Sequence, residues 1–345
     1  MNRNMIQINE EFFDHAIRRC ARDDVIDCKR YISTDKEDKN WIKNLLEGKR
    51  FKFSRNSYAQ LVELDDSEYI CLINSKCEPP HHIENFEYID VNPGLFTLLG
   101  SWDLLHFADG VHSSEIINEV LQDTEMIEGY TGHKYDEIRD KFVDILCYKV
   151  CMYESDIKVN SDSRFFHWAV LNLILQLSVF HNNNYDTETL QVWDKLVYEQ
   201  SFERTNYRSV LLSYCAMTWD VSYLYLYQCL EDAFAENAVA SLHSQLGLGL
   251  EDVSLLELSG LLYEELQWQP RDMDAIQSLL DRVDATSDIF AIIKELANDM
   301  SPAKWIYKTR NSIVHETRDT HIPFDDDAGW NLAITCLIKL ILESQ

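Results

Sequence analysis

In the second half of the chain, hydrophobic side chains recur with the period of an α-helix. Val210, Tyr214, Met217, Val221 and Leu224 follow one another at alternating spacings of four and three. This spacing predicts a single helix that continues through the whole segment.

A last helix is predicted near the C-terminus, after the carboxylates Asp325 to Asp327, which favour a helix N-terminus. The residues that trace one apolar face of this helix are Trp330, Ala333, Ile334, Leu337, Ile338 and Ile341.

The helix before it should begin at Pro302. Ser301 is a good N-cap, and the missing N–H of proline costs little at the first helical position. The helix must end before Pro323. The residues that we expect it to bury are Trp305, Ile306, Ile313 and, at the margin, Val314.

The first half has a different pattern, with two β-favouring runs, Tyr58 to Leu64 and Tyr69 to Ile73, around a polar turn. These runs predict a hairpin. The helical patterns around it cover Asn9 to Arg19, Trp41 to Glu47, Ser114 to Gln122 and Tyr135 to Met152. We therefore predict a mainly α chain, with an α+β domain over residues 1–155 and a helical domain over residues 160–345.

Composition agrees with a packed protein, since 46% of the 345 residues are hydrophobic. The nine cysteines are scattered and the N-terminus is polar, which predicts reduced thiols in a cytoplasmic protein. The apolar run from Phe165 to Phe180 is interrupted by polar residues and is shorter than the roughly 20 residues of a membrane span. We expect a buried or interface helix there and no membrane association.

Charge is distributed unevenly along the chain. The formal net charge is -28, from 59 acidic and 31 basic residues, which disfavours non-specific binding to nucleic acid. The window from Ala303 to Arg318 departs from this balance, with four basic residues and one acidic residue. The candidate catalytic residues of the chain lie in this basic window.

Arg310, Asn311 and His315 form a set suited to cleaving RNA without a metal. Histidine can take the proton of a ribose 2′-hydroxyl, because its pKa lies near neutrality. Arginine presents forked donors to the phosphate, and Asn311 could orient His315. On a helix Asn311 and His315 share a face, whereas Arg310 is about 140° away from His315. One copy supplies an acid or a base but not both, which favours a two-fold dimer.

Arg-Asn-x-x-x-His on the penultimate helix resembles the signature of the HEPN family (higher eukaryotes and prokaryotes nucleotide-binding), in which histidine follows arginine at a similar distance. The resemblance extends over roughly Asn206 to Gln345. It implies an all-helical bundle that dimerises, with both motifs in one cleft. Many members are metal-independent endoribonucleases that act as toxins or antiviral defence effectors. The resemblance gives Arg310 and His315 the catalytic positions, gives Asn311 the polar position beside the arginine, and implies no cofactor.

One segment departs from that family pattern. Val239 to Met300 holds twelve acidic residues and three basic ones between the two core helices, and could shield the cleft or dock a regulatory protein. The alternative function is therefore a non-catalytic HEPN-like scaffold or a nucleotide-binding interaction protein, which the net acidity of the chain favours.

Other clusters of chemically useful residues have plainer interpretations. Cys71, Cys77, His81 and His82 are metal-ligand types, but their cysteine spacing is outside the usual zinc pattern, and we expect no metal site. Cys147 and Cys151 should lie on one face of a helix as small core residues.

An aromatic stripe precedes the motif: Trp219, Tyr223, Tyr225 and Tyr227. Such side chains can stack on bases, but core packing is the stronger expectation, with room for one tyrosine at the cleft. The sequence contains no glycine-rich phosphate loop, Rossmann fingerprint or HExxH zinc motif.

Overall fold

Helices predominate in the structure, a computed structural model, and accompany one five-stranded antiparallel sheet. It describes residues 4–21, 28–79, 82–151, 158–160, 162–181, 183–199, 205–246, 272–297, 299–315 and 326–343. The chain divides into two compact units, Met1–Val179 and Phe180–Gln345. The prediction of a mainly α chain with an α+β first part is confirmed.

The sheet of the first unit has the strand order β1-β2-β3-β5-β4, and all neighbouring strands run antiparallel. Its strands are β1 (Leu46–Lys52), β2 (Tyr58–Leu64), β3 (Ser67–Ile73), β4 (Phe86–Ile89) and β5 (Ile145–Val150). The predicted hairpin is confirmed as β2 and β3, which turn at Asp65 and Asp66, both in the left-handed region.

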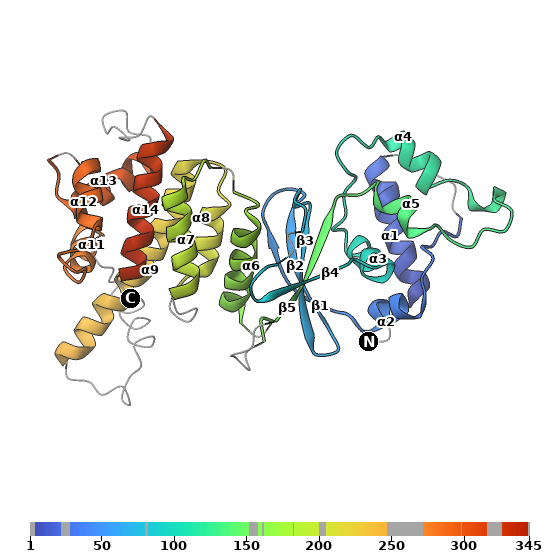
Figure 1. Ribbon diagram of the computed structural model, residues 1–345, viewed down its shortest axis with the longest axis horizontal. Helices are drawn as coiled ribbons and strands as arrows, with labels where there is room; N and C mark the ends of the chain where they lie inside the picture. Colours follow the sequence, from blue (N-terminus) through green and yellow to red (C-terminus); the bar gives the residue numbers. More distant parts are fainter. Residues whose placement is uncertain are drawn as a thin grey trace. The chain divides into compact units, whose positions relative to one another are not determined.

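Helices cover both faces of this sheet (Figure 1). The helical segments of the unit are α1 (Met5–Cys20), α2 (Lys36–Asn44), α3 (Pro93–Ser101), α4 (Ser113–Glu115), the π-helical η1 (Ile116–Val120), the 3₁₀-helical η2 (Thr124–Met126), α5 (Tyr135–Arg139) and α6 (Ser163–Leu177). Phe12 of α1 and Phe96 of α3 pack in the core with Val62 and Cys71 of the sheet. On the opposite face α6 packs against β1, where His167 contacts Phe51.

Two helix predictions in this unit were wrong in part. The helix predicted over Tyr135 to Met152 ends at Arg139, and Ile145–Val150 forms the strand β5, which pairs with β3 on one side and β4 on the other. The helix predicted over Trp41 to Glu47 gives way to β1. In both places a short apolar run fits either period, and pairing with neighbouring strands decides the outcome.

The boundary between the units also differs from the predicted one. We expected the second domain to begin at residue 160, but the contacts of α6 with the sheet place this helix in the first unit. Gln176 of α6 accepts the backbone N–H of Glu84 at 2.8 Å and so ties the helix to the segment before β4. The apolar run is therefore a covering helix of the sheet.

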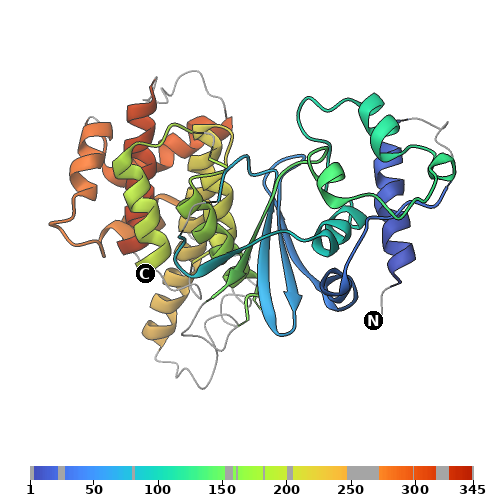
Figure 2. The same cartoon turned by 45° about the vertical axis from the view of Figure 1, so that its right-hand side comes forward.

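The second unit is helical throughout its described part (Figure 2). Its helices are α7 (Thr187–Glu199), α8 (Tyr207–Tyr214), α9 (Trp219–Leu246), α11 (Asp272–Leu280), α12 (Ile289–Ala297), α13 (Pro302–His315) and α14 (Asp327–Glu343). The C-terminal helix α14 packs against α7, α9 and α12, and all six residues of its predicted apolar face are buried. No helix in the described ranges is both long enough and apolar enough to cross a lipid bilayer.

The single helix predicted through Val210 and Leu224 is broken into α8 and α9. The chain turns between Tyr214 and Trp219, where Ser213 donates its hydroxyl hydrogen bond to the carbonyl of Ser222 at 2.8 Å. Met217 is 73% exposed as a result. In the sequence, the helical spacing of hydrophobic residues continues across the segment that forms this turn. Periodicity alone therefore could not reveal the break between the two helices.

Candidate active site on helix α13

Helix α13 carries all three predicted site residues. It begins at Pro302 after Ser301, as predicted, and ends at His315. Trp305 and Ile306 are buried as expected, whereas Val314 is 45% exposed. The expectation for Val314 was wrong because the buried stripe continues through Thr309 and Ser312, which lie on a different face of the helix.

Neighbouring helices hold α13 in place. It packs against α9, α11 and α12, and Tyr223 of α9 donates a hydrogen bond from its hydroxyl to the carbonyl of Ile306 at 3.2 Å. The hydroxyl of Ser312 donates a hydrogen bond to the carbonyl of Thr309 at 2.8 Å. The buried hydroxyls of Tyr223 and Ser312 are therefore both hydrogen-bonded. The helix is thus a rigid support for the side chains on its outer face.

Arg310 lies between α13 and α9. Its guanidinium is 5.7 Å from the centre of the Tyr227 ring, and its NH2 nitrogen is 3.7 Å from Oε1 of Glu231. The side chain keeps 27% of its surface exposed. The arginine is therefore restrained from one side and open to solvent from another.

Asn311 connects the arginine to the face that carries the histidine. NH1 of Arg310 donates a hydrogen bond to Oδ1 of Asn311 at 3.0 Å. Asn311 lies one turn before His315 on the same face of the helix, so this bond links the arginine to that face.

His315 is exposed at the last residue of α13. Among the described residues it has no hydrogen bond or ion pair. The imidazole is therefore accessible to a ligand, whereas the arginine already has protein partners.

Sequence reasoning missed Glu231, although the signal was present. Glu231 follows Tyr227 by four residues on α9, so both side chains lie on one face, and Tyr227 already belonged to the predicted aromatic stripe. Burial raises the pKa of Glu231 above its ordinary value, and Arg310 opposes this effect. Burial also raises the pKa of Tyr227. The side chain is 1% exposed, so the expectation of core packing is confirmed for this residue.

Part of the acidic segment over Val239 to Met300 belongs to the helical bundle. Its described parts include α11 and α12, which pack into the bundle through buried residues such as Ile276 and Ile293. Asp272, the first residue of α11, adds to the negative charge that acts on Tyr227 and Glu231. Part of the acidity therefore lies beside the candidate site.

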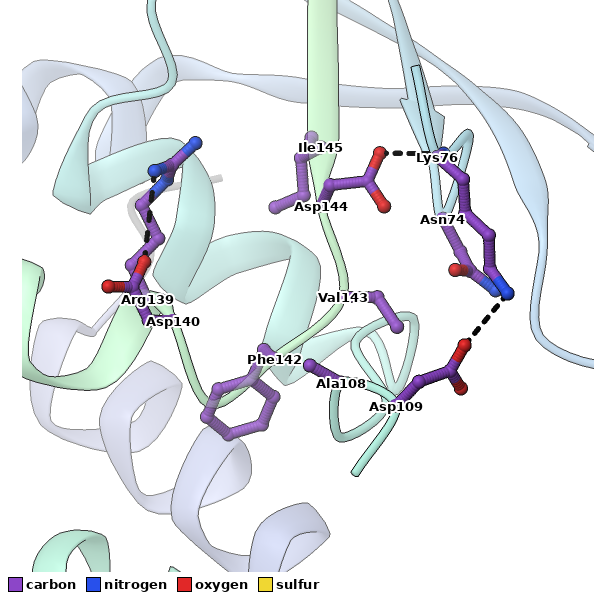
Figure 3. A pocket seen from close by; sticks show the side chains of 10 residues that line it. All are labelled: Asn74, Lys76, Ala108, Asp109, Arg139, Asp140, Phe142, Val143, Asp144 and Ile145. Atoms are coloured by element: carbon purple, nitrogen blue, oxygen red, sulfur yellow. Dashed lines mark hydrogen bonds and ion pairs between the residues drawn. The ribbon is translucent and has the colours of Figure 1, made fainter. Parts of the chain in front are cut away.

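The first unit holds a pocket of about 350 Å³ next to β5 (Figure 3). Lys76 pairs with Asp109 at 2.8 Å and donates its backbone N–H to Asp144 at 3.0 Å, while Arg139 lies 4.0 Å from Asp140. Because each of these charges has a partner, the pocket offers a weaker basis for catalysis than α13.

Cys71 lies in the second strand of the predicted hairpin, whereas Cys147 differs from its predicted position. Cys147 is on strand β5, not on a helix, and its Sγ is 3.7 Å from that of Cys71 on β3. Both are fully buried, as small core residues are. Within the described ranges no cluster of three or more histidine, cysteine or acidic side chains could hold a metal ion, and His81 lies outside those ranges.

Comparison with known proteins adds no relative. The chain matches no family model, no curated protein and no solved structure. The interpretation of α13 therefore depends on its residues and their geometry.

Proposed function

We propose that this chain is a metal-independent endoribonuclease of the HEPN type, active as a homodimer and serving as a cytoplasmic toxin or antiviral defence effector. The observation that carries the proposal is the arrangement on α13, where Arg310 donates a hydrogen bond to Asn311, which shares a helix face with the exposed His315. These are the groups that phosphodiester cleavage by a 2′-hydroxyl requires.

In the proposed reaction, His315 of one copy takes the proton of the ribose 2′-hydroxyl. The 2′-oxygen then attacks the phosphorus, and Arg310 stabilises the charge that builds on the phosphoryl oxygens. His315 of a second copy gives a proton to the leaving 5′-oxygen as its bond to phosphorus breaks. The products are a 2′,3′-cyclic phosphate and a 5′-hydroxyl end, and no metal takes part in the proton transfers.

Two features support the use of two copies. One copy contributes a single histidine on this face, whereas the reaction needs an acid and a base. In addition, the exposed Val314 adjoins His315, so a second copy of α13 would cover an apolar side chain while bringing the second histidine near.

The test of this proposal is cleavage of a labelled RNA by purified protein in the presence of EDTA. Arg310→Ala should lower the rate by at least 100-fold, in the range of a lost transition-state donor. Lys304→Ala removes an exposed cation from the same helix and should leave the rate unchanged. Equal loss in both variants would show that general positive charge, and not the site, supports activity.

A second candidate is a non-catalytic scaffold, which the contact between Arg310 and Glu231 favours. A cation paired within its own chain can serve as a structural link, and Asp272 nearby disfavours an RNA backbone. Overproduction in a host separates the two functions, because a nuclease toxin slows growth and Arg310→Ala relieves it. If both forms are harmless and the purified protein leaves RNA intact, the scaffold is the better description.

A further inference from the structure

A group of basic side chains gathers around the C-terminal turns of α1 in the first unit. This group, here called the α1 cluster, comprises His15, Arg18, Arg19, Lys52, Arg55 and His106. Arg19 donates from NH1 to Nδ1 of His106 at 2.7 Å and from NH2 to Oδ1 of Asp103 at 2.6 Å. These bonds fix α1 against the segment that follows α3.

Both histidine rings lie within hydrogen-bond distance of the arginines. Arg18 NH2 lies 2.6 Å from Nδ1 of His15, whose Nε2 is 3.1 Å from the carbonyl of Ser101. Asp103 Oδ1 is 2.9 Å from the same Nδ1. The cluster is therefore built from bonds that orient its cations without neutralising most of them.

Positive charge is in excess at this place. Burial lowers the pKa of His106, and together with the nearby charges of Arg19, Arg55 and Lys52 it brings this pKa to about 4, while the carboxylate of Asp103 opposes the shift. Asp103 is already bound by Arg19. Among the described residues, Arg18, Lys52 and Arg55 have no carboxylate partner.

Such an excess is unexpected in a chain whose net charge is -28, because exposed cations in an acidic protein readily find carboxylates. Arg18, Lys52 and Arg55 are all exposed, whereas Arg19 is half-buried. Three of these four cations are arginines, whose forked donors match phosphate oxygens.

The ring of Tyr58, beside the α1 cluster, already contacts two side chains. Tyr58 stacks on His106 with 6.4 Å between ring centres and an angle of 7°, and Lys52 lies 5.7 Å from the tyrosine ring centre. A base would have to displace one of these neighbours to stack on Tyr58. The cluster is therefore suited to the phosphates of a nucleic acid and not to its bases.

We propose that the α1 cluster binds the phosphodiester backbone of single-stranded RNA, with little sequence preference. The identity of the ligand rests on the proposed function, since a ribonuclease acts on this polymer. The chain would then hold RNA through its first unit and cut it with residues of its second.

The test uses the full-length His315→Ala variant, so that RNA stays intact, and measures the affinity for a mixed-sequence single-stranded RNA over a range of salt concentrations. Arg18→Ala with Arg55→Ala should weaken binding about 10-fold at low salt and lower the slope of log affinity against log salt by about 1.4, or 0.7 for each phosphate contact. The matched control is Lys36→Ala with Lys134→Ala, two exposed cations of the same unit outside the cluster. It should retain both the affinity and the slope.

Several outcomes would overturn the proposal: unchanged RNA binding in the cluster variant, equal loss in the control, or no RNA binding at all. Loss of binding to phosphatidylserine vesicles in the cluster variant, with RNA affinity kept, would also overturn it in favour of a membrane surface. The same experiment distinguishes failure of this RNA-binding proposal from failure of the proposed nuclease function. If the wild-type chain cuts no RNA but loses RNA affinity with the cluster, the binding site stands and the nuclease does not.

Discussion

Glu231 should compete with RNA for Arg310, and its replacement by glutamine should tighten RNA binding. At the observed 3.7 Å, two unit charges attract by about 1 kcal/mol in water and about 4 kcal/mol at an effective dielectric constant of 20. Because the two side chains are 27% and 38% exposed, solvent screening leaves about 0.5–1 kcal/mol. Glu231→Gln should therefore raise RNA affinity about two- to five-fold.

The assay is RNA binding in the His315→Ala background, with a double-mutant cycle between Glu231→Gln and Arg310→Ala. The gain should vanish when Arg310 is absent. Glu188→Gln, which alters another carboxylate near a cation of the second unit, is the control and should leave RNA affinity unchanged. The reasoning is refuted if Glu231→Gln weakens binding, or if its gain persists without Arg310.

The same pair predicts a dependence on pH. Burial raises the pKa of Glu231, so this carboxyl takes a proton at a higher pH than an exposed glutamate does. Once protonated, it is as neutral as glutamine. The difference in RNA affinity between the wild-type residue and Glu231→Gln should therefore shrink as the pH falls through that raised pKa. A difference that stays constant down to pH 4 would show that charge is not its cause.

Three further predictions concern the stability of the fold. Gly100→Ala should lower the free energy of unfolding by about 2–3 kcal/mol in denaturant titration, because the added Cβ would lie 2.1 Å from the buried ring of Phe12. The pKa of His106 is about 4, below that of the unfolded chain, so stability should fall as pH drops from about 6.5 to 4, and His106→Gln should reduce this fall in thermal unfolding at each pH. Asn331→Ala should cost about 2 kcal/mol in the same titration, because it removes the bond to the N–H of Asp186 at 3.0 Å inside the core.

Local signals in the sequence predicted α13 well. Ser301 and Pro302 gave its start, and Trp305 and Ile306 gave its buried side, because capping and packing of a helix depend on residues close in the sequence. The shared face of Asn311 and His315 follows in the same way from helical spacing.

Contacts between distant residues could not be predicted in this way. The pairing of Arg310 with Glu231 joins two helices across the bundle, and the α1 cluster joins α1 to the segments around Tyr58 and His106. The helix predicted over β5 was wrong for the same reason, since its short apolar run fits either period and pairing with β3 and β4 decides the outcome.

The central claim is that the chain cleaves RNA without a metal, by attack of a ribose 2′-hydroxyl whose proton His315 takes. It is tested most directly by mapping the ends of one RNA after incubation with the wild-type chain and with His315→Ala, both in EDTA. We expect 2′,3′-cyclic phosphate ends with the wild-type protein and none with the variant. The same ends at the same rate with His315→Ala, or intact RNA with both proteins, would contradict the claim.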